Sequence, residues 1–237
     1  MYGNQGTNDT WRRYSFNVAA YAGQEVRFQL YNWDANHYVY LDDLALEVDV
    51  PGWTIAGNMN GASFVQTVAG SHDDSLAFYR PTGTVGRLTS PAFTIPAEAQ
   101  SLKWWWRSRY NDNTDFYLLD AETDEILVTM YGNQGTNDSW RRYSYNVTPY
   151  VGRRVRFQLH NWDANHYVYL DDLVLEVDVP GWTIAGNMSG ASFVRVRSGS
   201  HDDSLAFYRP TGTTGRLTSP AFTIPAEAQS LKWWWRS

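Results

Sequence analysis

The chain contains no cysteine among its 237 residues. This absence excludes thiol nucleophiles, disulfide bonds and thiolate metal sites. Charged residues are also scarce, at 19% of the chain, and they sum to a net charge of -6. An acidic chain is poorly suited to nucleic acid or an anionic membrane, so neither is expected as the main partner. Long hydrophobic runs are missing as well, so the sequence predicts no membrane insertion.

An internal repeat with an offset of 129 residues dominates the sequence. The stretch NWDANHYVYLDDL begins at Asn32 and returns unchanged at Asn161. When residues 1–108 are aligned with 130–237, the two segments differ at 15 of 108 positions. Pro-Gly turns set the natural boundaries, so residues 50–178 are predicted to form one complete unit. Near-identical tandem copies are typical of a longer array of repeats.

The two ends of the chain are predicted to be half-units. Residues 1–49 match the C-terminal half of a unit, and residues 179–237 match the N-terminal half. Neither half can bury its own apolar face. We therefore expect the halves to pair into a second, incomplete sandwich, either within one chain or between neighbouring copies of the chain. Pairing between copies would produce a fibre.

Aromatic residues are abundant, at 16%, and they fall in short runs that are typical of strands. The stretches 102–107 and 155–160 both alternate apolar residues with polar, cationic or aromatic ones, which predicts strands with one face toward a core. About nine such runs per unit are separated by turn-forming segments. The sequence therefore predicts an all-β fold, an antiparallel jelly-roll β-sandwich that is repeated in tandem.

The order of motifs supports a family resemblance. SHDDSLAFY, GRLTSPAFTIP, LKWWWRSR, DFYLLDAETDE and YVYLDDLVLE follow one another through the unit. This order is similar to that of MAM-type domains, and it more closely resembles the bacterial choice-of-anchor J or cleaved-adhesin domains. The resemblance implies a jelly-roll sandwich in a secreted or surface-anchored bacterial protein. It also implies a role in adhesion or glycan binding, often with a structural calcium ion.

Paired aspartates are the candidate metal ligands. Two adjacent aspartates inside an apolar strand are costly unless they are paired, hydrogen-bonded or bound to a metal. Carboxylate oxygens are ligands that calcium prefers. The alternative is that these side chains cap turns or bind backbone amides at a β-bulge. The candidate pairs are Asp171 and Asp172, their counterparts Asp42 and Asp43, and, as a second site, Asp73 and Asp74.

Trp105 is the candidate for contact with a ligand. If Trp104 and Trp106 face the core, Trp105 faces outward beside Lys103 and Arg107. An indole flanked by polar groups suits a sugar ring, whose C–H face packs on aromatic rings. The alternative is that Trp105 packs under a loop or against a neighbouring unit. Three further residues are expected to extend the same polar face: Arg156, Gln158 and His160.

These observations predict a non-catalytic extracellular or cell-surface module for binding or adhesion. The favoured ligand is a glycan or a cell-surface polysaccharide. The alternative is a structural stalk or a fibre-forming repeat whose partners are other copies of itself. A glycoside hydrolase is a third reading, but the segment EVDVPG at 47–52 lacks a second glutamate. Glycoside hydrolysis generally needs two carboxyl groups, so no enzyme is expected.

Overall fold

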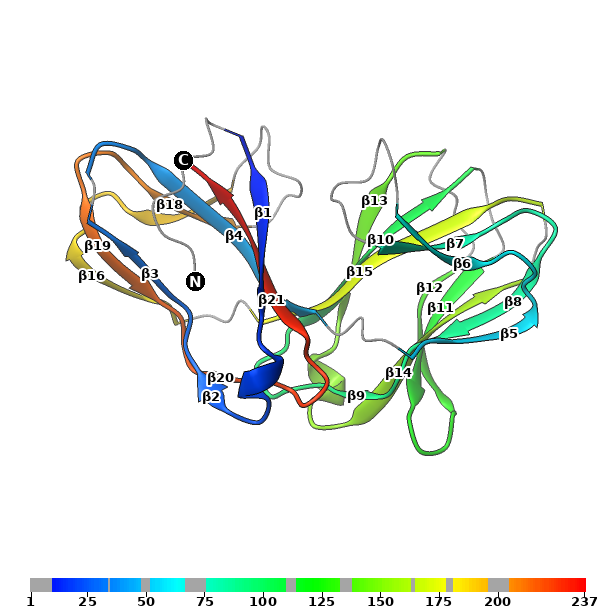
Figure 1. The fold of residues 1–237 in the computed structure, drawn as a ribbon. Coiled ribbons are helices and arrows are strands. Elements are labelled where there is room, and N and C mark those ends of the chain that lie inside the picture. Colours follow the sequence, from blue (N-terminus) through cyan, green and yellow to red (C-terminus); the bar gives the residue numbers. More distant parts are fainter. Residues whose placement is uncertain are drawn as a thin grey trace.

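The computed structural model of the chain describes residues 10–33, 35–47, 52–66, 76–109, 114–132, 138–162, 165–177, 181–195 and 205–237. Nearly all regular structure in these residues is antiparallel β-strand, with two 3-10 turns at Ala19–Tyr21 and Thr148–Tyr150. The strands form two lobes (Figure 1). The predicted antiparallel β-sandwich is therefore confirmed. No helix in the described residues is long and apolar enough to cross a membrane.

The middle of the chain folds into one lobe, the first sandwich, drawn in cyan to yellow in Figure 1. One of its sheets, the groove sheet, has the order β12-β11-β14-β8-β5, and β9 also pairs with β14. In the other sheet β15 lies between β10 and β7, with β13 and β6 at the sides. The strands are β5 (Thr54–Asn58), β6 (Ser63–Gln66), β7 (Leu76–Arg80), β8 (Val85–Thr89), β9 (Phe93–Thr94), β10 (Ser101–Ser108), β11 (Thr114–Asp120), β12 (Ile126–Gly132), β13 (Arg141–Asn146), β14 (Arg154–Asn161) and β15 (Val168–Glu176).

The core of the first sandwich lies between these two sheets, and the alternation in the sequence creates it. Trp104 and Trp106 from β10 are fully buried, as predicted. Phe157 from β14 and Phe116 from β11 meet them from the groove sheet, with the ring of Phe116 5.4 Å from that of Trp104. Aromatic rings at such spacings add roughly 0.5–1.5 kcal/mol per pair beyond the burial of their area.

The two ends of the chain pair with each other in the other lobe, the second sandwich, where blue and red ribbons run together (Figure 1). β21 lies between β1 and β4, and β19 lies between β16 and β3. In the structure this pairing closes within one chain. The strands are β1 (Arg12–Asn17), β2 (Glu25–Val26), β3 (Gln29–Asn32), β4 (Val39–Glu47), β16 (Thr183–Asn187), β17 (Ser192–Arg195), β18 (Leu205–Arg209), β19 (Thr214–Thr218), β20 (Phe222–Thr223) and β21 (Ser230–Arg236).

A direct strand pair joins the two sandwiches. β4 and β15 are equivalent strands of the two repeats, and they pair antiparallel at their C-terminal ends. Leu46 lies opposite Leu175, and Glu47 lies opposite Val174. The pairing is two-fold symmetric, because each strand offers the same positions to the other. The pair joins the sheet of the first sandwich that contains β10 and β15 to the sheet of the second that contains β4 and β21. The joined sheet has the order β1-β21-β4-β15-β10-β13, and we call it the shared sheet.

Asp172 lies at this junction on a β-bulge. The register between β10 and β15 shifts between Lys103 and Trp105, and Asp172 has a φ of 50°. Its buried carboxylate accepts a hydrogen bond from Lys232 Nζ at 2.9 Å and also forms an ion pair with Arg13. Both cations belong to the second sandwich. Asp172 therefore links the sandwiches electrostatically as well as through the backbone.

Lys232 is the centre of the buried charges at the junction. Its Nζ lies 2.6 Å from a carboxylate oxygen of Glu47 and 2.9 Å from Asp172. Burial would lower the pKa of Lys232, but Asp172 and Glu47 act in the opposite direction, so the pKa lies above its ordinary value. The lysine is therefore charged at neutral pH, and the carboxylates that face it compensate its burial.

Replacement of Asp172 by Asn should destabilise the protein. Asn also tolerates positive φ, so the change removes the charge and leaves the backbone preference almost intact. We expect the free energy of unfolding to fall by about 2–3 kcal/mol, toward the low end for a broken buried pair because Lys232 keeps Glu47. Chemical denaturation measures this change.

Asp138→Asn is the matched control for that experiment. Asp138 also has a positive φ, of 63°, and its carboxylate lies 2.8 Å from Arg107, but this ion pair is largely exposed. Exposed pairs contribute less than about 1 kcal/mol. Equal losses in the two variants would contradict the role assigned to Asp172.

Candidate functional site

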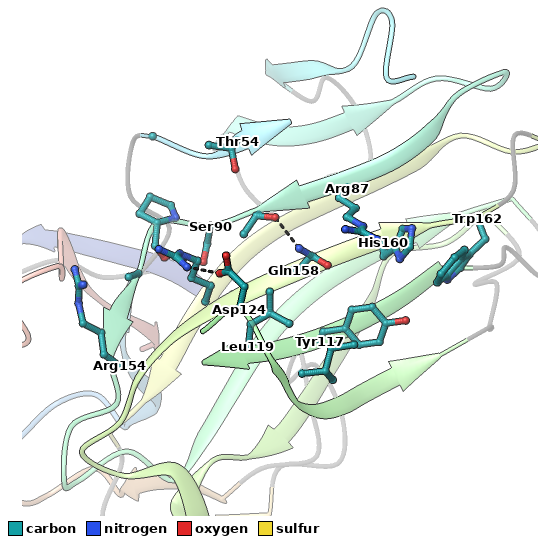
Figure 2. Close-up of a pocket in the computed structure, with 16 residues that line it drawn as sticks. Thr54, Arg87, Ser90, Tyr117, Leu119, Asp124, Arg154, Gln158, His160 and Trp162 are labelled. Atoms are coloured by element: carbon teal, nitrogen blue, oxygen red, sulfur yellow. Dashed lines mark hydrogen bonds and ion pairs between the residues drawn. The ribbon is translucent and has the colours of Figure 1, made fainter. Parts of the chain in front are cut away.

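A groove of about 700 Å³ runs over the outer face of the groove sheet in the first sandwich. Strands β5, β8, β11 and β14 contribute to it, together with the start of β12 and the segments that follow β8 and β14. Figure 2 shows its side chains standing on these strands. The lining residues are Gly52, Thr54, Arg87, Thr89, Ser90, Pro91, Ala92, Tyr117, Leu119, Asp124, Ile126, Arg154, Arg156, Gln158, His160 and Trp162.

Strand β14 supplies the middle of the groove. Its residues Val155, Phe157 and Leu159 are fully buried in the core. The alternation of a strand then sends the residues between them to the opposite face. Three of the predicted ligand-binding residues line the groove for this reason: Arg156, Gln158 and His160.

Trp162 forms an exposed aromatic platform at one end of the groove (Figure 2). Its side chain is 57% exposed, yet it is held in place. The indole Nε1 donates a hydrogen bond to Asp115 Oδ2 at 2.8 Å, and the ring centroids of Trp162 and His160 lie 3.6 Å apart. Because these two contacts hold the exposed ring in place, the platform is preorganised for a flat ligand.

Asp115 also organises the second aromatic residue of the groove. The hydroxyl of Tyr117 donates to the same Asp115 oxygen at 2.8 Å. Burial and this contact raise the pKa of Tyr117 to about 12, so the phenol remains protonated at neutral pH. Burial and the nearby Arg87 lower the pKa of His160, so its imidazole is neutral there. The ring cluster therefore carries no charge apart from that of Asp115.

Polar side chains surround these rings. Gln158 Nε2 donates to Thr89 Oγ1 at 3.0 Å, and Arg156 forms an ion pair with Asp124. Arg87 and Arg154 also line the groove and are exposed. The groove thus combines flat apolar surfaces with amide, hydroxyl and guanidinium donors. This combination is typical of sites that bind polar ligands with apolar faces.

Trp105 lies on a different face of the molecule from the groove. It projects from β10 in the shared sheet, whereas Arg156, Gln158 and His160 project from β14 in the groove sheet. The expectation that these residues share one polar face was therefore wrong. Alternation predicts the two faces of one strand, but it does not predict which sheet the strand joins.

The surroundings of Trp105 are more closed than expected. Its side chain is half-buried, opposite Arg142 on one neighbouring strand and Asp171 on the other. Lys103 is buried and donates to Glu176 at 2.8 Å, and Arg107 donates to Asp138 at 2.9 Å. The polar neighbours of Trp105 are therefore already engaged in contacts within the protein.

The described aspartates of the shared sheet lie among other protein groups. Asp172 faces Lys232 and Arg13, and Asp171 Oδ1 accepts a hydrogen bond from the Asp172 amide at 2.8 Å. Asp42 is buried opposite Trp234. Across the described ranges, no three His, Asp or Glu side chains gather as metal ligands would. Three of the predicted ligands lie outside the described part of the chain: Asp73, Asp74 and the side chain of Asp43.

The sequence analysis did not single out Trp162, Arg87, Tyr117 or Asp115. One signal was available for Trp162. It follows Asn161 at the end of a strand, among polar residues, where no apolar alternation requires a tryptophan. Asp115 and Tyr117 share strand β11, whereas Arg87 comes from β8, and only the sheet order places both strands beside β14.

The second sandwich carries a smaller pocket of about 370 Å³, and two of its lining residues, Tyr31 and Arg216, correspond to His160 and Arg87 of the groove. Tyr31 replaces His160 there, and Arg216 lies 5.0 Å above the Tyr31 ring. Trp33, the counterpart of Trp162, is 66% exposed, and its ring lies 5.6 Å from that of Tyr31. The aromatic and guanidinium groups thus recur in both repeats, although no counterpart of Tyr117 is present.

No family model matches the chain. No curated protein sequence matches it either. Solved structures with a similar fold include the K3 cleaved adhesin domain of Lys-gingipain from Porphyromonas gingivalis, at 12% identity and a TM-score of 0.42 over 56% of this chain and 98% of that one. TmCBM61 in complex with β-1,4-galactotriose is 15% identical, with a TM-score of 0.41 over 54% of this chain and 90% of that one. A family 16 carbohydrate-binding module is 18% identical, with a TM-score of 0.38 over 53% and 90% of the two chains.

Proposed function

We propose that this protein is a non-catalytic, extracellular carbohydrate-binding module and that the groove on β14 holds the glycan. The observation that carries the proposal is the exposed indole of Trp162, fixed by Asp115 and His160 at one end of an open, polar groove. A sugar ring has one apolar C–H face and a rim of hydroxyl groups. An exposed indole suits the face, and the neighbouring donors suit the hydroxyls.

The charges in the groove favour an acidic glycan. Three guanidinium groups line it, from Arg87, Arg154 and Arg156, and Asp124 is the one carboxylate among the described lining residues. Guanidinium groups bind carboxylates through paired, charge-assisted hydrogen bonds. Uronic acids, which are sugars that carry a carboxylate, match this arrangement better than neutral sugars do.

The same count of carboxylates favours binding over catalysis. Glycoside hydrolases generally use two carboxyl groups on either side of the bond that is cleaved. The single lining carboxylate, Asp124, is already in an ion pair with Arg156. A glycan in this groove therefore meets no pair of carboxyl groups among the lining residues that the structure describes.

A structural role in a stalk is the second candidate function. The junction between β4 and β15, which joins two near-identical units directly through the backbone, favours it. In that case the partners of each unit are its neighbours, and the groove needs no ligand. The glycan measurement described next separates the two functions.

Trp162→Ala should abolish glycan binding on an array of oligosaccharides or lower the affinity at least tenfold, which corresponds to about 1.4 kcal/mol. The change removes the stacking surface together with the indole's contacts to Asp115 and His160, and the fold should be kept because the indole is 57% exposed. Trp105→Ala is the matched control on the other sheet, and it should leave binding unchanged. Loss of binding only in Trp105→Ala would move the site to the shared sheet. No binding by the unaltered protein on a broad array would favour the structural role.

Arg87→Gln should weaken binding of uronate-containing oligosaccharides roughly tenfold, because a hydrogen bond with a charged partner contributes about 1.5–3 kcal/mol. It should change the affinity for neutral oligosaccharides far less. Titration calorimetry at low and high salt measures both, and the uronate affinity should fall as salt rises. Equal effects on the two classes of sugar would contradict the preference for acidic glycans.

Calcium remains a proposal for the aspartate pair at Asp73 and Asp74. If calcium binds the native state there, it stabilises that state by mass action. A thermal melt in EDTA should then show a lower midpoint than a melt with added calcium. Asp73→Asn combined with Asp74→Asn should remove the difference, and identical melts of the unaltered protein would contradict calcium binding.

A further inference from the structure

The hairpin that joins β11 to β12 places a carboxylate of the protein inside the groove. Strand β11 ends at Asp120, and β12 begins at Ile126. Asp124, near the end of the connecting turn, lines the groove, and its carboxylate forms an ion pair with Arg156. A dashed line beside Asp124 marks this ion pair in Figure 2. The groove thus holds a guanidinium that is already in contact with a carboxylate.

The turn itself is held by Asp120 rather than by Asp124. The Asp120 Oδ1 atom accepts hydrogen bonds from the backbone amides of Glu122 and Thr123, at 2.9 and 3.2 Å. Its Oδ2 atom lies 2.8 Å from Arg153. These contacts, and the two amides above all, hold the pKa of Asp120 below its ordinary value. Within the described ranges, the carboxylate of Asp124 supplies none of the bonds that shape the turn.

The backbone at Asp124 does not require an aspartate either. Its φ is 59°, in the left-handed region, and its amide donates to the Asp120 carbonyl oxygen at 3.0 Å. Glycine and asparagine adopt this conformation at least as readily as aspartate does. The turn alone therefore does not account for a carboxylate at this position, whereas the contact with Arg156 gives the carboxylate a role.

Arg156 lies in the middle of the groove. On β14 it stands between Arg154 and Gln158, and all three residues line the groove on the face that is turned away from the core. Figure 2 shows Arg154 and Trp162 toward opposite ends of the groove. A glycan that spans the groove from Trp162 to Arg154 therefore meets the ion pair of Arg156 and Asp124 on its way.

We propose that Asp124 occupies the place of a uronate carboxylate on Arg156 in the free protein, and that an acidic glycan displaces it. This inference rests on the proposed function, because it assigns a carboxylate-binding position within the same groove. The chemistry of the two carboxylates is the same. A guanidinium binds the carboxylate of an aspartate and that of a uronate through the same charge-assisted hydrogen bonds.

The contact between Asp124 and Arg156 is weak enough for such an exchange. The two side chains are 69% and 29% exposed, so water screens the attraction between their charges. Because Asp120 holds the turn, release of Asp124 requires a rotation of its side chain and no change in the backbone. A uronate in a glycan that also stacks on Trp162 has additional contacts, which favour its side of the exchange.

The exchange makes Asp124 a specificity-determining residue of the groove. An acidic glycan has to compete with Asp124 for Arg156, so the ion pair lowers the affinity of the groove for uronates. A neutral glycan carries no group that takes the place of the aspartate, and the ion pair persists beside it. Asp124 thereby reduces the difference in affinity between acidic and neutral glycans.

Asp124→Asn should raise the affinity of the whole chain for tetragalacturonate about two- to fivefold, the range expected for a weak exposed ion pair. The gain should be smaller with cellotetraose, a neutral probe of the same length. Asparagine also tolerates the positive φ, so the turn should be kept. Titration calorimetry with both probes measures these affinities.

Glu125→Gln is the matched control for this experiment. It removes the same charge from the neighbouring residue, whose side chain is exposed and does not line the groove. It should leave both affinities unchanged. Equal gains in Asp124→Asn and Glu125→Gln would indicate a general effect of charge and would overturn the inference.

A double-mutant cycle tests whether the effect passes through Arg156. In an Arg156→Gln background, Asp124→Asn should no longer raise the affinity for tetragalacturonate, because the guanidinium for which the two carboxylates compete is gone. A gain that persists in this background would overturn the inference. Unchanged affinity in Asp124→Asn, with binding by the unaltered protein, would overturn it and leave the proposed function standing. If no form of the protein binds either probe or any sugar on the oligosaccharide array, the proposed function fails together with the inference.

Discussion

The antiparallel contact between β4 and β15 is the constraint on which the rest of the structure depends. It brings Leu46 of one repeat against Leu175 of the other and makes one sheet out of two. Because the sheet is continuous, the positions of β21, β1, β10 and β13 follow from this central pair. The groove sheet of the first sandwich and the sheet β16-β19-β3 of the second then pack their apolar faces on this shared sheet and turn their polar faces outward.

Buried ion pairs at the junction add an electrostatic contribution to the contact between β4 and β15. Most of the shared sheet is held by apolar side chains, which pack without strong directional preference. The contacts of Asp172 with Lys232 and Arg13 are directional, and their geometry depends on the relative position of the two sandwiches. A buried ion pair is weak evidence for added stability, but it can specify one arrangement over others. In this protein the bulge at Asp172 makes the carboxylate available for that role.

Sequence alone was sufficient for the fold class and for the inward faces of individual strands. The alternation around Trp104 and Phe157 decides which side chains enter the core, and the structure follows it. It was not sufficient for the site. Asp172 had to be paired, hydrogen-bonded or metal-bound, but its partners Arg13 and Lys232 lie 159 and 60 residues away. The groove likewise depends on sheet order, which sets Arg87 beside β14 and leaves Trp105 on another sheet.

The near-identity of the two repeats has a consequence for how the chain reaches its native state. The strands β4 and β15 differ at one position, Ala45 against Val174, and the partners of each strand are also near-identical. During refolding, β21 therefore meets two almost equivalent docking strands, and only one of them gives the native arrangement. Tandem domains with such similar sequences are prone to misassembly between neighbours. Wrong pairing between the near-identical repeats is therefore the misfolding route that this chain has to avoid.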